Sequence, residues 1–163
     1  MTQAESLLTE FDAEMASTRK LLERVPEAKS DWKPHEKSKS LGDLATQVAN
    51  LLSFLPLIAK HDEFDAMNFQ RPPKFSTTAK LLELFDEKVK AGREALAGIP
   101  DSLMPQTWSL KRGGQTFISR PRAAVIRGLT MSHHIHHRGQ LTVYLRMLDV
   151  PLPGMYGPTA DEM

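Results

Sequence analysis

The sequence predicts an all-α protein, a four-helix bundle with a small hairpin or irregular segment before the last helix. Apolar residues recur at three-and-four spacing through four long segments, which is typical of amphipathic helices. The loops between them are short enough for neighbouring helices to pack. A chain of 163 residues suits one domain with a buried core. We therefore expect a single domain over 1–163, with the bundle at 1–148 and a proline-rich tail at 149–163.

The first helix is expected from about Gln3 to Arg24, because Pro26 cannot continue it. Its apolar face comprises Leu7 or Leu8, Phe11, Met15, Leu22 and Val25. A polar connector, residues 26–40, follows.

The second helix is expected to begin at Ser40, which together with Asp43 resembles a capping box. Its apolar face comprises Leu44, Val48, Leu51, Leu52, Leu55 and Ile58. Pro56 removes one backbone donor, so the helix should kink or end near it. The segment 61–78 contains two adjacent prolines and is predicted as a loop.

The third helix is predicted at 79–96, closed by Gly98 and Pro100. Its inward positions are Leu81, Leu82, Phe85 and Val89. Residues 107–118 alternate on either side of Gly113-Gly114, which predicts a hairpin.

The last helix is predicted at 121–148 and contains four histidines within five residues: His133, His134, His136 and His137. Each helical residue advances about 100°, so His133 and His137 lie only about 40° apart around the axis. The residues that share their side of the wheel are Ile126, Leu129, Gln140, Tyr144 and Met147. The far side holds Arg127, Arg138, Thr142 and Arg146. The histidine pair is therefore expected to face the interior and the arginines to face water.

A buried imidazole pair is destabilising unless its nitrogens find partners, at about 1 to 3 kcal/mol for each unmatched group. A divalent cation bound by both rings would remove that cost, and so would hydrogen bonds within the core. His134 and His136 are expected on the flanks, as supports of the site, dimer contacts or solvated residues. A zinc-peptidase motif H-E-x-x-H is absent because His134 follows His133.

Composition excludes several classes of protein. With 21 basic and 20 acidic residues the chain has no strong attraction to nucleic acid or membrane, and neither is an expected partner. A local basic cluster is expected to be a solvated face: Lys111, Arg112, Arg120, Arg122 and Arg127. Without cysteine there is no disulfide or thiolate metal site. The first residues do not resemble a secretory signal, and the apolar stretch 51–59 is too short for a membrane span, so we expect a cytoplasmic protein.

The stretch HHIHHRGQLTVYLR, with DWKPHEKSKSLGDLA before it and DVPLPGMYGPTADE after it, resembles the DinB-like family of bacterial four-helix-bundle proteins. The resemblance spans nearly the whole chain in the right order. It implies a divalent metal, zinc or nickel, bound by three histidines, of which His133 and His137 are two. The third would stand at position 47, after L-G-x-L-A, where this chain has Gln47.

An amide oxygen is a poorer ligand than imidazole for zinc or nickel, so Gln47 should weaken the site. Three outcomes are compatible with the sequence: a metal with Gln47 or water as third ligand, a weakly bound metal, or a metal-free pocket. The resemblance also implies an enzyme that transfers a low-molecular-weight thiol, as co-substrate, to a small electrophile. The alternative is a non-catalytic binding or stress-response module. No catalytic residue is assigned, and a homodimer is expected.

Two further residues are candidates for substrate binding or for supporting the metal ligands. Gln140 shares the histidine side of the helix, where it would bond a ligand or His137, or only pack. Trp32 in the connector would lie near the pocket mouth or plug the core. Arg138 is assigned an ordinary surface or interface role.

Overall fold

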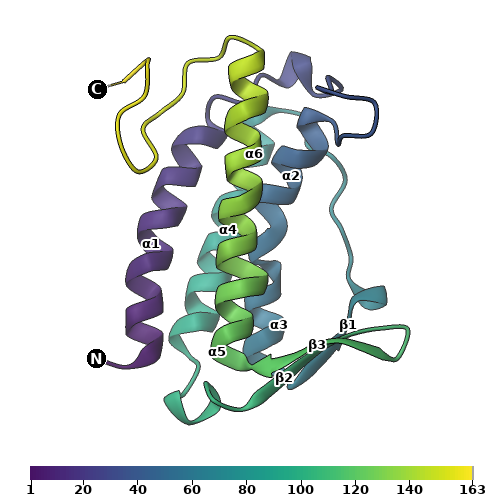
Figure 1. Cartoon of the computed structure of the whole chain (residues 1–163), viewed down its shortest axis with the longest axis vertical. Coiled ribbons are helices and arrows are strands. Elements are labelled where there is room, and N and C mark those ends of the chain that lie inside the picture. The colour runs from purple at the N-terminus through teal and green to yellow at the C-terminus, as the bar shows by residue number, and fades with distance from the viewer. Residues whose placement is uncertain (163) are drawn as a thin grey trace.

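The computed structural model describes residues 1–162. Its long helices lie side by side, and a small sheet closes one end (Figure 1). The helices are α1 (Gln3–Leu22), α2 (Leu41–Asn50), α3 (Phe54–Lys60), α4 (Thr78–Ala97), α5 (Arg122–Val125) and α6 (His133–Met147). The strands are β1 (Glu63–Asp65), β2 (Thr107–Arg112) and β3 (Gln115–Pro121). The fold is therefore mostly helical, as predicted, and the predicted hairpin is part of a three-stranded sheet.

Short polar side chains fix the beginnings of the long helices. Thr2 and Glu5 form a reciprocal capping box at α1, and Ser40 accepts the backbone N–H of Asp43 at the start of α2. Thr77 caps α4 in the same way, and Gly98 follows its last residue. These local signals explain why the predicted helix bounds agree with the structure to within a few residues.

The second helix breaks one turn before Pro56, as its sequence predicts. A 3₁₀ turn, Leu51–Ser53, separates α2 from α3, because the proline ring crowds the carbonyl group four residues earlier. The segment Leu41–Lys60 is long and apolar enough to cross a membrane, but 67% of its most apolar window is buried in the bundle. The segment therefore belongs to the core of the helical bundle.

The chain crosses the length of the bundle between α3 and α4. Helices α1 and α6 run in one direction, whereas α2, α3 and α4 run in the other, so the connection 61–77 returns along the outside of α2 and α3 (Figure 1). The sequence predicts this segment only as a loop. It also contains β1, which escaped prediction because three residues are too few to show alternation.

The predicted hairpin is confirmed, and β1 adds a third strand parallel to β2. Gly113 and Gly114 have φ values of 57° and 81°, which a two-residue hairpin turn requires. The Asp65 carboxylate accepts their N–H groups at 3.1 and 2.9 Å, so it fastens the end of β1 to the turn. This anchors the start of the long connection.

One member of the basic cluster was wrongly expected to face water. Arg122 is only 1% exposed, donates to the Ile58 carbonyl at 2.9 Å and pairs with Asp62. The chain turns back at Asp62 to form β1, so a carboxylate distant in sequence covers this arginine. The neighbouring Arg112, Arg120 and Arg127 are exposed, as expected.

The core lies between the helices and continues under the sheet. Its fully buried members include Phe11, Leu44, Leu52, Leu55, Leu81, Phe85, Trp108 and Leu141. The tail packs on its own bundle through Leu152 and Met155, one of the two placements left open by the sequence. Ion pairs from Asp161 to Arg146 and from Glu162 to Arg24 hold it there.

Candidate metal centre

Three side chains from two neighbouring helices converge at the middle of the bundle. His133 and His137 come from the first turns of α6, with ring centroids 4.6 Å apart, and Gln47 comes from α2. The Nε2 atoms of the two rings lie 2.9 Å apart, and the Gln47 Nε2 atom lies 2.7 Å from that of His137. All three side chains are half-buried. The sequence-predicted ligand set is thus brought together.

The hydrogen bonds at the outer nitrogens fix the form of both rings. His133 Nδ1 faces the Leu129 carbonyl at 3.3 Å, and His137 Nδ1 faces Gln140 Oε1 at 2.7 Å. The Leu129 carbonyl can only accept, and the Gln140 amide accepts through its oxygen in this orientation, so we assign the proton of each neutral ring to Nδ1. Each Nε2 atom therefore presents a lone pair, and the two lone pairs point at the same space. A cation shared by both nitrogens would relieve their repulsion.

Within the described residues, only one of the two polar atoms of the Gln47 amide has a hydrogen-bond partner. Its nitrogen donates to His137, but its oxygen is buried and accepts no hydrogen bond from residues 1–162. Rotating the amide by 180° exchanges the two atoms and turns the oxygen toward the histidines. In that orientation a metal ion would bind the oxygen, and the nitrogen would take the buried position in which the oxygen now has no partner among residues 1–162.

These residues fit a divalent metal in two positions and less well in the third. Imidazole nitrogens suit zinc and nickel, and hydrogen-bonded Nδ1 atoms are the usual support of histidine ligands. Two tetrahedral ligands stand about 3.3 Å apart, so the Nε2 atoms need to separate by only a few tenths of an ångström. However, no group of three His, Cys, Asp or Glu side chains with metal-binding spacing occurs within residues 1–162. Gln47 would have to complete the set.

Burial keeps both rings neutral, which is the form that binds a metal. Loss of hydration lowers the pKa of His133, and the charge of His136 lowers it further. Burial also lowers the pKa of His137. The nearby charges of His133, His136 and Lys39 lower it further. The Gln140 hydrogen bond acts in the opposite direction.

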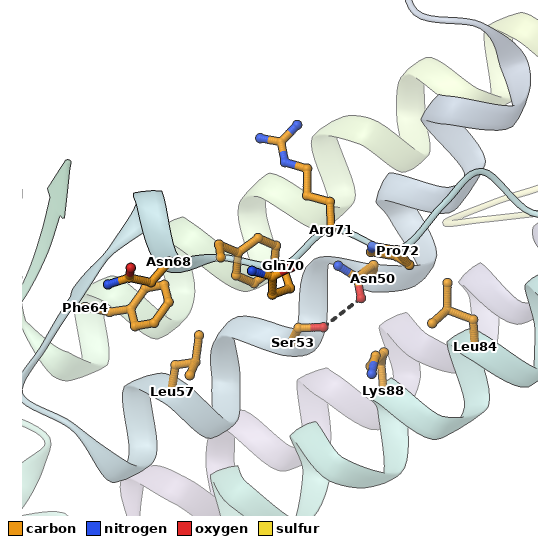
Figure 2. Close-up of a pocket in the computed structure, with 11 residues that line it drawn as sticks. Asn50, Ser53, Leu57, Phe64, Asn68, Gln70, Arg71, Pro72, Leu84 and Lys88 are labelled. Atoms are coloured by element: carbon orange, nitrogen blue, oxygen red, sulfur yellow. Dashed lines mark hydrogen bonds between the residues drawn. The ribbon is translucent and has the colours of Figure 1, made fainter. Parts of the chain in front are cut away.

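A pocket of about 440 Å³ opens beside the histidines and includes Gln47 and His133 in its wall. Its apolar part is formed by Leu51, Phe54, Phe69, Pro72 and Leu129. A second pocket of about 460 Å³ lies under residues 68–72, where Leu84 and Lys88 of α4 face α3 (Figure 2). Both pockets share Phe69 and Arg71, so the long connection forms a wall of each.

The residues just before α6 form a π-helical turn, Ile126–Ser132. A π turn holds about one residue more than an α turn, so the segments before and after it are rotated relative to each other. It ends directly before His133. A single helical wheel drawn over 121–148 therefore has the wrong phase at one end.

The predicted orientation of α6 is partly wrong. The line of α6 residues that faces the bundle centre is His134, Arg138, Leu141 and Leu145, all buried. His133 and His137 lie on the flank toward α2, and Met147 is 55% exposed although it was placed inward. The helical wheel gave the wrong orientation because two of these four buried residues are polar. The positions of the apolar residues alone therefore do not identify the buried face.

His134 and Arg138 were expected on a flank and on the surface, but they are 0% and 2% exposed. Arg138 pairs with Glu14 of α1, donates to the Glu14 carbonyl at 3.0 Å and to Tyr156 of the tail at 2.6 Å. Both Arg138 and His134 Nε2 contact the Thr18 hydroxyl, at 3.2 and 2.9 Å. Burial lowers the pKa of His134 to about 3. These contacts form a buried polar network on the α1 side of α6, in which His134 Nδ1 has no hydrogen-bond partner within residues 1–162.

The remaining predicted site residues lie around the centre. Gln140 is exposed. It is hydrogen-bonded to His137, which is one of the alternatives that the sequence left open. His136 is exposed, with its ring centroid 5.0 Å from that of His137. Trp32 is half-buried against Tyr144, edge to face at 5.7 Å, and packs on the core.

The pocket residues that sequence reasoning missed include Lys39, Phe69 and Arg71. They come from a polar connector and a proline-rich loop, where no periodicity indicates which side chains turn inward. The one available signal was the adjacent prolines after Arg71, which keep that part of the loop extended.

Comparison with known proteins agrees with the fold. The DinB family model matches residues 1–163. A DinB-like protein from Bacillus cereus ATCC 10987 superposes with a TM-score of 0.76 at 21% identity, covering 96% of this chain and 100% of that one. A DinB-like protein, YjoA, from Bacillus subtilis gives 0.71 at 19% identity, covering 97% and 99%.

A curated relative, the uncharacterized protein YrdA of Bacillus subtilis strain 168, is 47% identical over 32 residues. That match covers 20% of this chain and 19% of YrdA, so the chain spans about a fifth of the relative's length. The family model, by contrast, covers the whole sequence. The chain therefore belongs to the DinB family.

Proposed function

We propose that this protein binds a divalent metal, zinc or nickel, through His133, His137 and Gln47, and uses it to transfer a low-molecular-weight thiol to a small electrophile. The observation that supports metal binding is the convergence of the Nε2 atoms of His133 and His137 at 2.9 Å beside the amide of Gln47, whose oxygen has no hydrogen-bond partner within residues 1–162. Each histidine is oriented by an acceptor at Nδ1, as metal-binding histidines are.

A bound metal with open positions lowers the pKa of a thiol or water and stabilises the developing negative charge. The chain's own residues would orient and shield the reactants. Gln140 holds the ring of His137, and the apolar wall around Phe54 and Leu129 excludes water from the pocket. For an epoxide, the sulfur would form a bond to carbon, the carbon–oxygen bond would break, and the oxygen would take up the proton released by the thiol.

The test is metal content after purification without added metal, followed by turnover of styrene oxide with a panel of thiols. The parent is compared with Gln47→His and His137→Ala. We expect Gln47→His to raise metal occupancy, and His137→Ala to abolish both occupancy and turnover. His136→Ala is the matched control, because that ring lies next to His137 but is exposed. If neither the parent nor Gln47→His retains metal, the proposed centre is wrong.

A second candidate is a non-catalytic small-molecule-binding or stress-response module, and the observation that favours it is the amide at position 47. Replacing an imidazole ligand should weaken metal binding by at least about 10- to 100-fold. Bound metal without turnover on any thiol would exclude the transferase and support the module.

A further inference from the structure

The pocket beside the histidines carries positive charge that no described contact uses. Lys39, Arg71 and Lys74 line it, together with the single carboxylate of Asp43. Lys74 already pairs with Asp31. Lys39 and Arg71 pair with no carboxylate in residues 1–162, so the rim has a net positive charge.

An arginine without a partner is unusual in this chain. Arg19, Arg24, Arg93, Arg122, Arg127, Arg138 and Arg146 each form an ion pair. Within residues 1–162, those that form none are Arg71, Arg112 and Arg120. Arg112 and Arg120 project from the hairpin, whereas Arg71 lines both pockets. A guanidinium group is suited to binding a carboxylate through two parallel hydrogen bonds.

The backbone around Arg71 is held in place. Phe69 stacks on Phe54 with centroids 4.5 Å apart and the rings nearly parallel, and the Phe75 N–H donates to the Thr46 hydroxyl at 3.1 Å. Pro72 restricts Arg71 itself to an extended conformation. In Figure 2 the guanidinium group points away from Ser53 and Lys88. Arg71 is thus an exposed cation on an anchored segment.

Lys39 approaches the same pocket from the other side. Its carbonyl accepts the Tyr144 hydroxyl at 3.2 Å, which ties the end of the connector to α6. Its ammonium group is close enough to His137 to contribute to the lowered pKa of that ring. The two unpaired cations and the apolar wall therefore line one cavity, with His133 in its lining.

We propose that this pocket binds a small amphiphilic anion, a carboxylate with an apolar body. The carboxylate pairs with Arg71 and Lys39, the body packs on Phe54 and Leu129, and the ligand lies beside His133. A cavity of about 440 Å³ is within the usual range for small-molecule sites. This inference names the substrate class for the proposed function and relies on that function only for the reaction, because binding itself needs no metal.

The experiment measures calorimetric affinities of the full chain, dialysed against EDTA, for 4-phenylbutanoate and its neutral analogue 4-phenylbutanamide. We expect the acid to bind about tenfold more tightly than the amide, since charged partners strengthen hydrogen bonds in a partly enclosed site. Arg71→Gln and Lys39→Gln should each remove most of this preference, because they weaken binding of the acid much more than binding of the amide. Arg120→Gln, an exposed and unpaired arginine outside the pocket, is the matched control.

Equal affinity for acid and amide, or no binding of either at millimolar concentration, would overturn the inference. Survival of the preference in the Arg71→Gln/Lys39→Gln double variant would also overturn it. Because EDTA removes metal, acid binding here with no metal content or turnover elsewhere would refute the proposed reaction and leave this site standing.

Discussion

Two pairs of side chains on α6, each four residues apart and offset by one position, have opposite environments. His134 and Arg138 are sealed against α1 and the tail, whereas His133 and His137 lie toward α2 beside a pocket. In the sealed pair, an ion pair and shared hydrogen bonds compensate the buried charge of Arg138, but His134 Nδ1 has no hydrogen-bond partner in residues 1–162. In the open pair, His133 and His137, the two Nε2 atoms face each other, and only that of His137 receives a hydrogen bond from Gln47. Burial and an unpaired nitrogen therefore do not identify a site by themselves, whereas ring nitrogens that converge beside a pocket do.

The largest effect should follow from breaking the sealed pair. Arg138→Ala leaves the Glu14 carboxylate, which is only 12% exposed, without a counter-charge and with the Tyr156 hydroxyl as its remaining partner, so the free energy of unfolding should fall by about 3 to 5 kcal/mol. Urea denaturation measures this. Metal content per folded molecule should be unchanged, and a loss of metal at unchanged stability would show that the two pairs have been assigned to the wrong roles.

Breaking the open pair should have the complementary effect. His137→Ala should lower metal affinity by more than about 100-fold, because it removes one of two imidazole ligands. In EDTA its unfolding midpoint in urea should stay close to that of the parent, since the ring is half-buried, accepts from the Gln47 amide and donates to the Gln140 amide, and both amides are on flexible side chains. Competition with a chromophoric chelator measures the affinity. Equal affinities in variant and parent would contradict the assignment.

Lowering the pH should destabilise the protein through His134. Burial lowers the pKa of His134 to about 3, so between pH 6.5 and 3 the unfolded chain binds more protons than the folded chain. Stability should therefore fall as the pH drops through this window, by up to about 1.4 kcal/mol per pH unit from this residue.

His134→Gln keeps a hydrogen-bonding group near Thr18 but cannot titrate, so its stability should fall less steeply between pH 7 and 5. The pKa values of His133 and His137 are also lowered, and the difference between parent and variant isolates His134. Urea denaturation at several pH values gives both slopes. Identical slopes of stability against pH in parent and variant would show that His134 is not the group that titrates.

The smallest effect is expected at an arginine that the helical wheel groups with Arg138. Arg127 pairs with Glu10, but the two side chains are 55% and 33% exposed. Arg127→Ala should lower the free energy of unfolding by less than about 1 kcal/mol, because exposed ion pairs contribute little. A loss as large as that of Arg138→Ala would show that burial does not separate the two arginines.

The sequence by itself determined the features that depend on near neighbours. Caps at Thr2, Ser40 and Thr77, the break before Pro56 and the Gly113-Gly114 turn all act within a few residues, so the helices and hairpin followed from them. The spacing of His133 and His137 likewise ensured that their rings would meet.

Only the tertiary structure decided which face of α6 is buried and what surrounds the histidines. Arg138 is buried because Glu14, 124 positions away, neutralises it, and no local pattern contains that information. The pocket exists because α3 and α4 are parallel, so that residues 61–77 must cross outside them and bring Phe69 and Arg71 to α2. Long-range pairing decides such features, since the energy that stabilises them comes from residues far apart in the chain.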